Sequence, residues 1–209
     1  MRRFLFSLVF LSLLLSGCTV SPAPEAEQTT SPEVKTPVFA DAAEIPAMFW
    51  PMKQFETRVT LKKFGQEVHD RFNGFHTGED AELLPEEQDT EVAVYAAIDG
   101  KIIYRNWVSG YGGVMVMEHE VDGQTLNTLY GYIDLSQPLA SLGDAVRAGT
   151  PIAYLGDDKS RETDGERKHL HFGMYSGRAL KLNAYMPKKT DISEWINPGE
   201  YLRAHGAVD

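Results

Sequence analysis

The chain is 209 residues long, which gives room for one ordinary domain with accessory segments. Apolar residues make up 43% of the sequence and aromatic residues 11%, enough for a packed core, so the composition excludes a globally disordered chain. The formal net charge is −10, with 30 acidic residues against 20 basic ones. This balance argues against nucleic acid as a partner and against charge-driven binding to anionic lipid headgroups.

The first 18 residues have the pattern of an export signal. Arg2 and Arg3 supply positive charge, and a largely apolar run follows at 4–15, which is short for a membrane span and suits a signal segment. The run ends in Leu-Ser-Gly-Cys, which resembles the lipobox of bacterial lipoproteins. The resemblance implies a signal peptide at 1–17, lipid attachment at Cys18, and a membrane-anchored lipoprotein on the extracytoplasmic face, in the periplasm or at the cell surface. An uncleaved anchor helix is the alternative.

Residues 18–51 have the composition of a tether. Six of the eleven prolines lie there, mixed with Ser, Thr, Ala and Glu, and such a segment cannot bury much surface. Its last part, 45–50, is apolar enough to pack onto a folded domain. We therefore expect a lipid-attached, extended tether, followed by one domain with a C-terminal extension at residues 52–209.

From about residue 55 the sequence changes to short runs rich in Val, Ile and Tyr that are separated by turn residues, a pattern typical of β-strands. Two Asp-Gly dipeptides, which favour tight turns, predict one hairpin each. The predicted strands are 92–95 and 101–104 around Asp99-Gly100, 114–121 and 125–133 around Asp122-Gly123, and the separate strands 151–155 and 169–175. Helix signals are few, with one short helix predicted near 197–202. The sequence therefore predicts a mostly β domain with an antiparallel sheet.

Two histidine settings indicate a metal site. His76 and Asp80 are four residues apart, and His169 and His171 alternate in a predicted strand. In a strand both imidazoles point to one face, while Leu170 turns to the core. Zinc accepts imidazole nitrogen and carboxylate oxygen, and a catalytic site uses three such ligands with a fourth position for water. We expect Zn²⁺ to bind His76, Asp80 and one histidine of the pair, with the other histidine beside the water.

The order and spacing of the motifs make this hypothesis more specific. The segments are Phe64-Gly65 with 76–80, the hairpin segment 94–102, the central strands 111–119 and 128–131, the lead-in 142–153, and His169-Leu170-His171-Phe172. Together they resemble the lysostaphin/LytM-type zinc metallopeptidases, which are peptidoglycan endopeptidases. The resemblance implies an antiparallel sheet of the duplicated hybrid type with zinc in a groove. It also implies that His76, Asp80 and His171 are the metal ligands, and that His169 is a catalytic histidine.

Three features depart from the pattern of this family. Tyr132 follows Leu-Tyr-Gly, where the family usually has a second catalytic histidine. A phenol is a poor base at neutral pH, because its pKa is near 10, but it can donate a hydrogen bond to a developing oxyanion. We therefore expect Tyr132 to act as a catalytic hydrogen-bond donor. The segment 157–168 is longer and more charged than the usual Gly/Ser-rich loop, and Gly173 stands where Glu is often found.

The remaining histidines and the tryptophans have simpler interpretations. His119 is predicted to be a strand residue with a hydrogen-bond partner, and nothing around His69 or His205 completes a metal site. The acidic run 86–89 is predicted to be a solvated loop and not a calcium site. The tryptophans are predicted to be core anchors; they are Trp50, Trp107 and Trp195.

These observations favour a zinc-dependent endopeptidase that cleaves peptidoglycan stem or cross-bridge peptides by metal-activated water. The alternative is a catalytically impaired module that binds peptidoglycan or regulates another cell-wall hydrolase, and Tyr132 is the feature that favours it. A third hypothesis is a structural zinc ion whose fourth protein ligand is Tyr132 or His169. The expected partners are a peptidoglycan peptide, the membrane through the lipid and, for the alternative, a cell-wall hydrolase.

Overall fold

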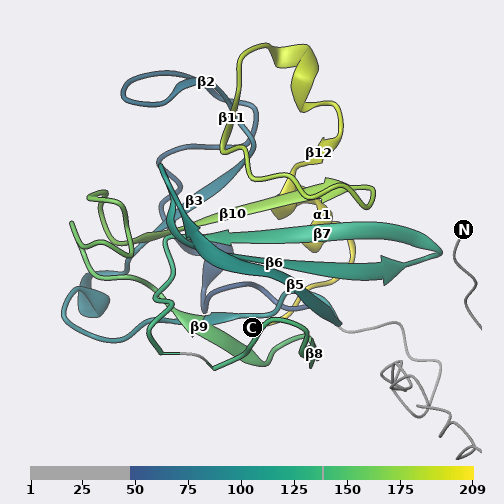
Figure 1. Ribbon diagram of the computed structural model, residues 1–209, viewed down its shortest axis with the longest axis horizontal. Helices are drawn as coiled ribbons and strands as arrows, with labels where there is room; N and C mark the ends of the chain where they lie inside the picture. The colour runs from purple at the N-terminus through teal and green to yellow at the C-terminus, as the bar shows by residue number, and fades with distance from the viewer. Residues whose placement is uncertain (1–47, 138) are drawn as a thin grey trace, which may run out of the picture. The chain divides into compact units, whose positions relative to one another are not determined.

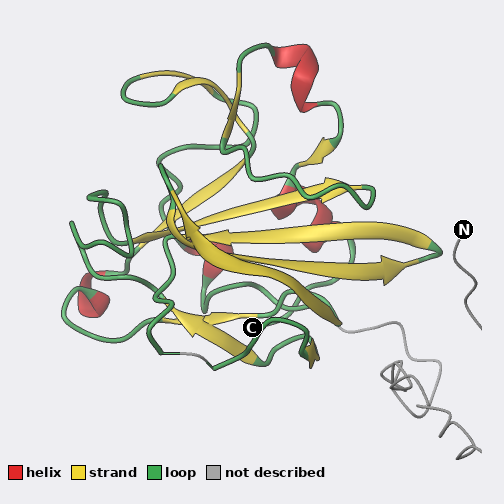
Figure 2. Cartoon of the chain, in the orientation of Figure 1, coloured by secondary structure: helices red, strands yellow, loops and turns green. Residues whose placement is uncertain are grey.

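The computed structural model describes residues 48–137 and 139–209 (Figure 1). The predicted signal peptide, the lipid-attachment residue Cys18 and the tether up to residue 47 lie outside the described residues. Strands dominate the described part of the chain, with a few short helices between them (Figure 2). The predicted mostly β fold with antiparallel sheets is therefore confirmed.

Residues 48–51 pack onto the folded domain, as the apolar composition of 45–50 predicts, although they lie before the expected boundary at residue 52. Met48 and Trp50 are buried in the hydrophobic core. The backbone amide of Phe49 donates a hydrogen bond to the carbonyl of Ala97, and Phe49 forms a bridge with Val208 near the end of the chain. These apolar side chains stabilise the domain because they are buried in its core, whereas in an extended tether they would be exposed to water.

A seven-stranded antiparallel sheet forms the centre of the domain (Figure 1). Its order is β12-β10-β7-β6-β5-β8, and β3 also pairs with β10. A three-stranded sheet has the order β1-β2-β11, and β4 pairs with β9 in a two-stranded sheet. The strands are β1 Glu67–His69, β2 Asn73–His76, β3 Gly78–Glu82, β4 Ala93–Tyr95, β5 Gly100–Val108, β6 Gly112–Val121, β7 Gln124–Gly131, β8 Ala145–Val146, β9 Pro151–Tyr154, β10 His169–Ser176, β11 Tyr185–Met186 and β12 Trp195–Ile196.

The hairpin β6–β7 turns at Asp122-Gly123, as the sequence predicts. Asp122 has a φ of 50° and Gly123 a φ of 73°, the left-handed conformation that a two-residue hairpin turn requires. The ladder continues without a register shift as far as Gly131. The next residue, Tyr132, is thereby placed at the far end of the hairpin from the turn.

The hairpin predicted at Asp99-Gly100 is wrong. β4 pairs with β9, whereas β5 pairs with β6 and β8, so the two flanking strands lie in different sheets. Neither residue of this dipeptide has a positive φ. The glycine instead permits a close contact, because a Cβ at Gly100 would lie 2.3 Å from Nδ1 of His119. Gly100 therefore marks tight packing and not a turn.

The larger hydrophobic core joins the central sheet to β4, β9 and the C-terminal helix. Its residues include Val94 of β4, Ile152 of β9 and Phe172 of β10. The helix α1 (Pro198–Ala204) contributes Leu202, and the side chain of Asn197 caps its first turn by accepting a hydrogen bond from the backbone amide of residue 200. The short helix predicted near 197–202 is confirmed. The 3-10 helices are Phe55–Thr57, Pro85–Glu87 and Lys189–Ile192.

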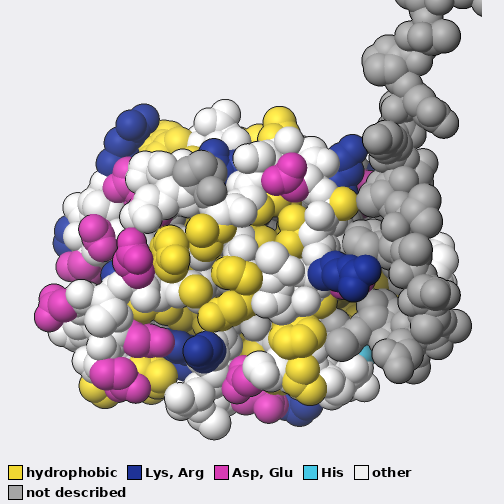
Figure 3. Space-filling model, turned by 90° about the horizontal axis from the view of Figure 1, so that it is seen from below, with side chains coloured by type: hydrophobic (Ala, Val, Ile, Leu, Met, Phe, Trp, Pro, Cys, Tyr) yellow, Lys and Arg dark blue, Asp and Glu magenta, His cyan; other side chains and the backbone are white. Residues whose placement is uncertain are grey.

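The surface carries both kinds of charge. In the space-filling view, acidic and basic side chains lie around the rim of one face, and apolar side chains gather nearer its centre (Figure 3). Within residues 48–137 and 139–209, no helix is long and apolar enough to cross a membrane.

Candidate metal centre

Three strands bring the predicted metal ligands together. His76 ends β2, Asp80 lies in the middle of β3, and His171 lies in β10 directly opposite Asp80 in the β3–β10 ladder. Side chains alternate along a strand, and Leu170 and Phe172 accordingly turn away from this face into the hydrophobic core. The alternation expected from the sequence is therefore confirmed for β10.

The potential ligand atoms of the three residues converge on one point. Nε2 of His76 lies 3.0 Å from Nδ1 of His171 and 3.2 Å from Oδ1 of Asp80. Nδ1 of His171 lies 3.0 Å from the same carboxylate oxygen. In a tetrahedral zinc site with ligands at roughly 2.0–2.1 Å from the ion, neighbouring ligand atoms are about 3.3 Å apart. The spacing of the three atoms matches one face of such a tetrahedron.

The outer nitrogens of the two imidazoles have partners of their own. Nδ1 of His76 lies 3.3 Å from the carbonyl oxygen of Lys63, and Nε2 of His171 lies 3.2 Å from the hydroxyl of Tyr111. A neutral imidazole has one N–H, so donation from Nδ1 to the carbonyl leaves Nε2 of His76 with a lone pair toward the cluster. Such outer partners fix the tautomer of histidines that bind metal.

Burial and hydrogen bonding give these groups the charge states that a zinc site needs. His76, Asp80 and His171 are at most 3% exposed. Burial alone would raise the pKa of Asp80, but the surrounding histidines hold this pKa well below its usual value, so the carboxylate is charged. Burial lowers the pKa of His171 to about 4, so its imidazole is neutral at pH 7. A carboxylate and a neutral imidazole are the forms in which these side chains bind metal.

Arg167 holds the second oxygen of the Asp80 carboxylate. Its guanidinium lies 3.3 Å from Oδ2 of Asp80 and also binds both carboxylate oxygens of Glu82 at 2.6–3.0 Å. Oδ1 of Asp80 is thereby left facing the two imidazoles. The sequence interpretation missed Arg167, although its position two residues before His169 was an available signal, since alternate residues share a face.

His169 has one nitrogen fixed and one free. Nδ1 lies 2.7 Å from the carbonyl oxygen of Arg167, where an N–H donor is required. Nε2 is buried and has no hydrogen-bond partner among the described residues, and it lies 3.5 Å from Oδ2 of Asp80. Because the proton is on Nδ1, Nε2 carries a lone pair beside the cluster. His169 is therefore suited to accept a proton at Nε2. Without a proton or another donor, this buried lone pair would have no hydrogen bond.

Tyr132 packs on His169 and is not free to act as a base. The ring centroids of the two side chains are 4.1 Å apart, and the Tyr132 hydroxyl donates a hydrogen bond to the carbonyl of Gly110 at 3.0 Å. Burial raises the pKa of Tyr132 far above 10, and the negative charge of Asp80 raises it further. The phenol is thus neutral at pH 7. It can donate to a substrate only if it leaves its bond to Gly110.

The sequence profile described as Peptidase family M23 matches residues 74–183, which is more than half of the chain and includes all four of the candidate histidine and aspartate residues. The chain belongs to peptidase family M23. In amino-acid sequence, the chain is 36% identical over 110 residues to the murein hydrolase activator EnvC of Escherichia coli (strain K12). The alignment covers 52% of the chain and 22% of EnvC, so the chain spans about a fifth of the length of that relative.

Solved structures share the fold of the M23 domain. The catalytic domain of the antimicrobial peptidase lysostaphin from Staphylococcus simulans superposes with a TM-score of 0.52 and 20% identity, over 71% of this chain and 95% of that one. LytU gives a TM-score of 0.50 and 22% identity, over 70% and 86% of the two chains. A chain of a SpoIIQ–SpoIIIAH pore-forming complex superposes with a TM-score of 0.53 and 18% identity, over 76% of this chain and 92% of that one. The lysostaphin/LytM-type family predicted from the motifs is confirmed.

A charged bridge connects two loops of the M23 domain near the cluster. Arg71, in the turn between β1 and β2, binds a carboxylate oxygen of Asp164 at 2.9 Å and one of Glu166 at 2.8 Å. Asp164 also accepts a hydrogen bond from the backbone amide of Gly110 at 2.8 Å. Both acidic residues lie in the segment 157–168, whose length and charge depart from the family pattern. The departure therefore has a structural role, since it ties this loop to the opposite turn.

Aromatic rings lie against the cluster from the same turn and from β11. Phe72 stacks on Tyr185, with ring centroids 5.4 Å apart, and the ring of Tyr185 lies 5.0 Å from that of His76. Lys62 hydrogen-bonds the Tyr185 hydroxyl and forms an ion pair with Asp70. Tyr185 thus covers the His76 side of the cluster, and all three candidate ligands are buried.

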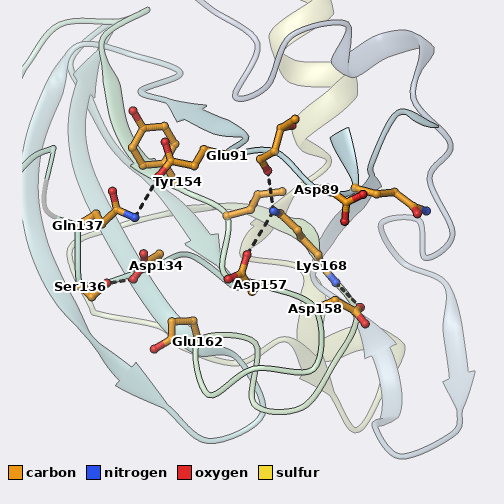
Figure 4. A pocket seen from close by; sticks show the side chains of 13 residues that line it. Asp89, Glu91, Asp134, Ser136, Gln137, Tyr154, Asp157, Asp158, Glu162 and Lys168 are labelled. Atoms are coloured by element: carbon orange, nitrogen blue, oxygen red, sulfur yellow. Dashed lines mark hydrogen bonds and ion pairs between the residues drawn. The ribbon is translucent and has the colours of Figure 1, made fainter. Parts of the chain in front are cut away.

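A cavity of about 730 Å³ is lined by residues of the segments 88–91, 134–137 and 154–168, and none of the candidate ligands lines it (Figure 4). Lys168 crosses this cavity and donates a hydrogen bond to the carbonyl of Thr90 at 2.8 Å, with Asp157 at 3.5 Å. Because Lys168 directly precedes His169, these contacts anchor the start of β10. The carboxylates around the cavity are Asp89, Glu91, Asp134, Asp157, Asp158 and Glu162.

The other candidate residues mostly have the simple roles expected. His119 lies in β6, and its ring nitrogens contact the carbonyl of Asp99 at 2.9 Å and the hydroxyl of Thr128 at 2.8 Å. His69 and His205 are exposed, and neither belongs to the cluster formed by His76, Asp80 and His171. The prediction for Trp107 is wrong: it is 38% exposed, because it lies on the outer face of β5, where its indole N–H bonds the carbonyl of Arg161. Trp50 and Trp195 are buried, as predicted.

Proposed function

We propose that this M23 domain is a zinc-dependent endopeptidase that cleaves peptidoglycan stem or cross-bridge peptides. The observation that carries the proposal is the convergence of Nε2 of His76, Oδ1 of Asp80 and Nδ1 of His171, with the free Nε2 of His169 beside them. Membership of a peptidase family and a fold shared with lysostaphin support the reaction class. Peptidoglycan as the substrate is supported by the name of the relative, a murein hydrolase activator.

His76, Asp80 and His171 would hold the metal, and His169 would handle the proton. A bound zinc ion would supply Lewis-acid polarisation of the peptide carbonyl and acidify a water molecule. Nε2 of His169 accepts a proton on one side of the site, and its Nδ1–H, fixed by the Arg167 carbonyl, keeps that nitrogen available. Tyr132 orients the His169 ring by packing on it and offers its hydroxyl to developing negative charge once it leaves Gly110.

The direct test is hydrolysis of purified peptidoglycan by the full-length protein with zinc restored. Release of new amino termini by the parent protein is expected. The variant His171→Ala should abolish it, because two ligands cannot hold the ion in place. The variant Tyr132→His restores the residue usual in the family and should raise the rate, by about 10²-fold if the imidazole supplies a general base.

Each outcome separates the two main hypotheses. If the parent does not hydrolyse peptidoglycan and Tyr132→His does, the domain binds zinc but has lost catalysis through this single position. If neither the parent nor Tyr132→His hydrolyses peptidoglycan although both bind zinc, the peptidase proposal is wrong.

A regulatory role is the second candidate, and two observations favour it. The three candidate ligands are buried, and the Tyr132 hydroxyl is already engaged by the carbonyl of Gly110. The relative EnvC is named as an activator of murein hydrolases. In this case the domain would bind peptidoglycan or a cell-wall hydrolase and alter the activity of the latter. The test adds the parent or His171→Ala to a separate cell-wall hydrolase. If both stimulate that hydrolase equally, the result supports the regulatory role over catalysis.

The proposed place of action is the extracytoplasmic face of a membrane. The lipobox-like sequence before Cys18 and the proline-rich tether that follows it support a lipid-anchored domain that reaches the cell wall. The names of the cell-wall relatives agree with this location. Metabolic labelling with a radioactive fatty acid tests the anchor, since the label should enter the parent protein and not Cys18→Ser.

A further inference from the structure

Tyr111 contacts the cluster at the one ring nitrogen of His171 that a metal would not use. Its hydroxyl oxygen lies 3.2 Å from Nε2 of His171, and the two rings meet edge to face with centroids 5.0 Å apart. Tyr111 is 2% exposed and His171 is 1% exposed. Bulk water therefore has no access to replace this contact, and Nε2 depends on Tyr111 for its hydrogen bond.

The glycine residues around Tyr111 explain how its ring reaches this position. A Cβ at Gly131 would lie 2.6 Å from Cδ1 of Tyr111, so only glycine leaves room for the ring over β7. Gly131 is the register partner of His171 in the β7–β10 ladder, which brings the phenol next to the imidazole. Gly112 has a φ of 70°, and a Cβ there would lie 1.9 Å from the carbonyl oxygen of Glu162, so the turn that presents Tyr111 also needs glycine.

A chain of hydroxyl groups sets the direction of this hydrogen bond. The Thr77 hydroxyl donates to the carbonyl of Asn183 at 2.6 Å, so its oxygen is left as an acceptor. Tyr111 hydrogen-bonds Thr77, so its phenol can donate to that oxygen and leave its own oxygen as an acceptor toward His171. With a metal on Nδ1, the proton of His171 would lie on Nε2 and donate to the Tyr111 oxygen, 3.2 Å away.

We propose that Tyr111 is a positioning residue that fixes the tautomer and orientation of His171 so that Nδ1 can bind zinc. The inference rests on the proposed zinc site and adds to it a residue that touches neither the ion nor the substrate. It explains why glycines flank Tyr111 where the chain enters β6: they let this segment present the acceptor that a buried ligand histidine requires. Tyr111 belongs to the same buried group as Tyr132, but its hydroxyl faces the metal ligand.

The test is the zinc affinity of the full-length chain, measured by competition with a chromophoric chelator. Tyr111→Phe should weaken zinc binding about 10- to 100-fold, the usual effect of removing an outer partner of a ligand histidine. Tyr130→Phe is the matched control, because Tyr130 is also fully buried and its hydroxyl also has two partners, the Ala97 amide and Thr128. Removing that hydroxyl costs core hydrogen bonds without touching the cluster, so the zinc affinity of this variant should equal that of the parent.

A second measurement follows the hydrogen bond itself. In the zinc-loaded parent, nitrogen NMR of labelled histidine should find the Nε2–H of His171 in a hydrogen bond, and an Nε2–H signal that is unchanged in Tyr111→Phe would overturn the inference. A zinc affinity of Tyr111→Phe within twofold of that of the parent would also overturn it. A loss of zinc affinity in Tyr130→Phe equal to the loss in Tyr111→Phe would do the same. Failure of the parent itself to take up zinc would sink the proposed function and this inference together, whereas the other outcomes leave the zinc site intact.

Discussion

Asp80 is the residue on which the site depends most, because every other member contacts it. Its two oxygens face different groups: Oδ1 faces His76 and His171, and Oδ2 faces Arg167. The division lets the guanidinium hold the carboxylate in place while one oxygen remains for a metal. A charged carboxylate with so little exposure is stable only when it is paired in this way.

His119 gives a pH dependence that is separate from the metal site. Burial lowers its pKa from 6.5 to about 4, while its ring holds β6 to the Asp99 carbonyl and to Thr128. The unfolded chain therefore binds a proton more readily than the folded one as the pH falls below 6.5. The stability that neutral His119 contributes is complete above about pH 6.5 and is lost between pH 6.5 and 4, amounting to about 3 kcal/mol.

Denaturant unfolding of the parent and of His119→Gln at a series of pH values checks this prediction. Between pH 7 and pH 4 the free energy of unfolding of the parent should fall by about 3 kcal/mol more than that of the variant, which cannot titrate at this position. Parallel curves would show that His119 does not control the acid sensitivity.

At the scale of elements, two identical dipeptides mark the limit of sequence reasoning. Asp122-Gly123 forms the predicted turn, whereas Asp99-Gly100 connects two sheets. The local signal is the same, and the difference lies in distant contacts such as that of Gly100 with His119, which no local pattern encodes. The cluster of His76, Asp80 and His171 could be predicted, because strand alternation, ligand chemistry and the resemblance to a known family constrain these candidate ligands. Arg167 and Tyr111 were not assigned, because their roles depend on which strands pair.

The loop 157–168 and the turn between β1 and β2 are joined by a charged bridge. Arg71, Asp164 and Glu166 form it, and the Arg71 side chain is 51% exposed. Exposed ion pairs of this kind contribute about 0–1 kcal/mol and are screened by salt. The bridge therefore holds the two segments together only weakly.

Arg71→Ala should accordingly speed the removal of zinc by a chelator about two- to fivefold, the effect of losing up to 1 kcal/mol. High salt should speed removal from the parent and have less effect on the variant. Arg178→Ala is the control, since Arg178 also bridges acidic side chains, Glu118 and Glu120, on an exposed surface. Equal rates in the parent and in Arg71→Ala would show that the bridge does not govern access.

At the scale of the whole molecule, one sheet supplies both the scaffold and the ligands. β10 pairs with β3, β7 and β12; His171 has a paired strand on each side, and His169, the first residue of β10, pairs with β3. Catalytic groups on such rigid elements are held more precisely than groups on loops. Of the three departures from the family pattern, the segment 157–168 is a loop, whereas Tyr132 directly follows β7 and Gly173 lies within β10.

The zinc content of the purified full-length protein and of three variants tests the central claim most directly. We predict one zinc ion per chain in the parent, almost none in His171→Ala or Asp80→Ala, and close to one in His169→Ala, because His169 lies beside the ion and does not bind it. Loss of zinc from His169→Ala as complete as from His171→Ala would contradict the account. It would indicate a four-ligand structural site with no position for water.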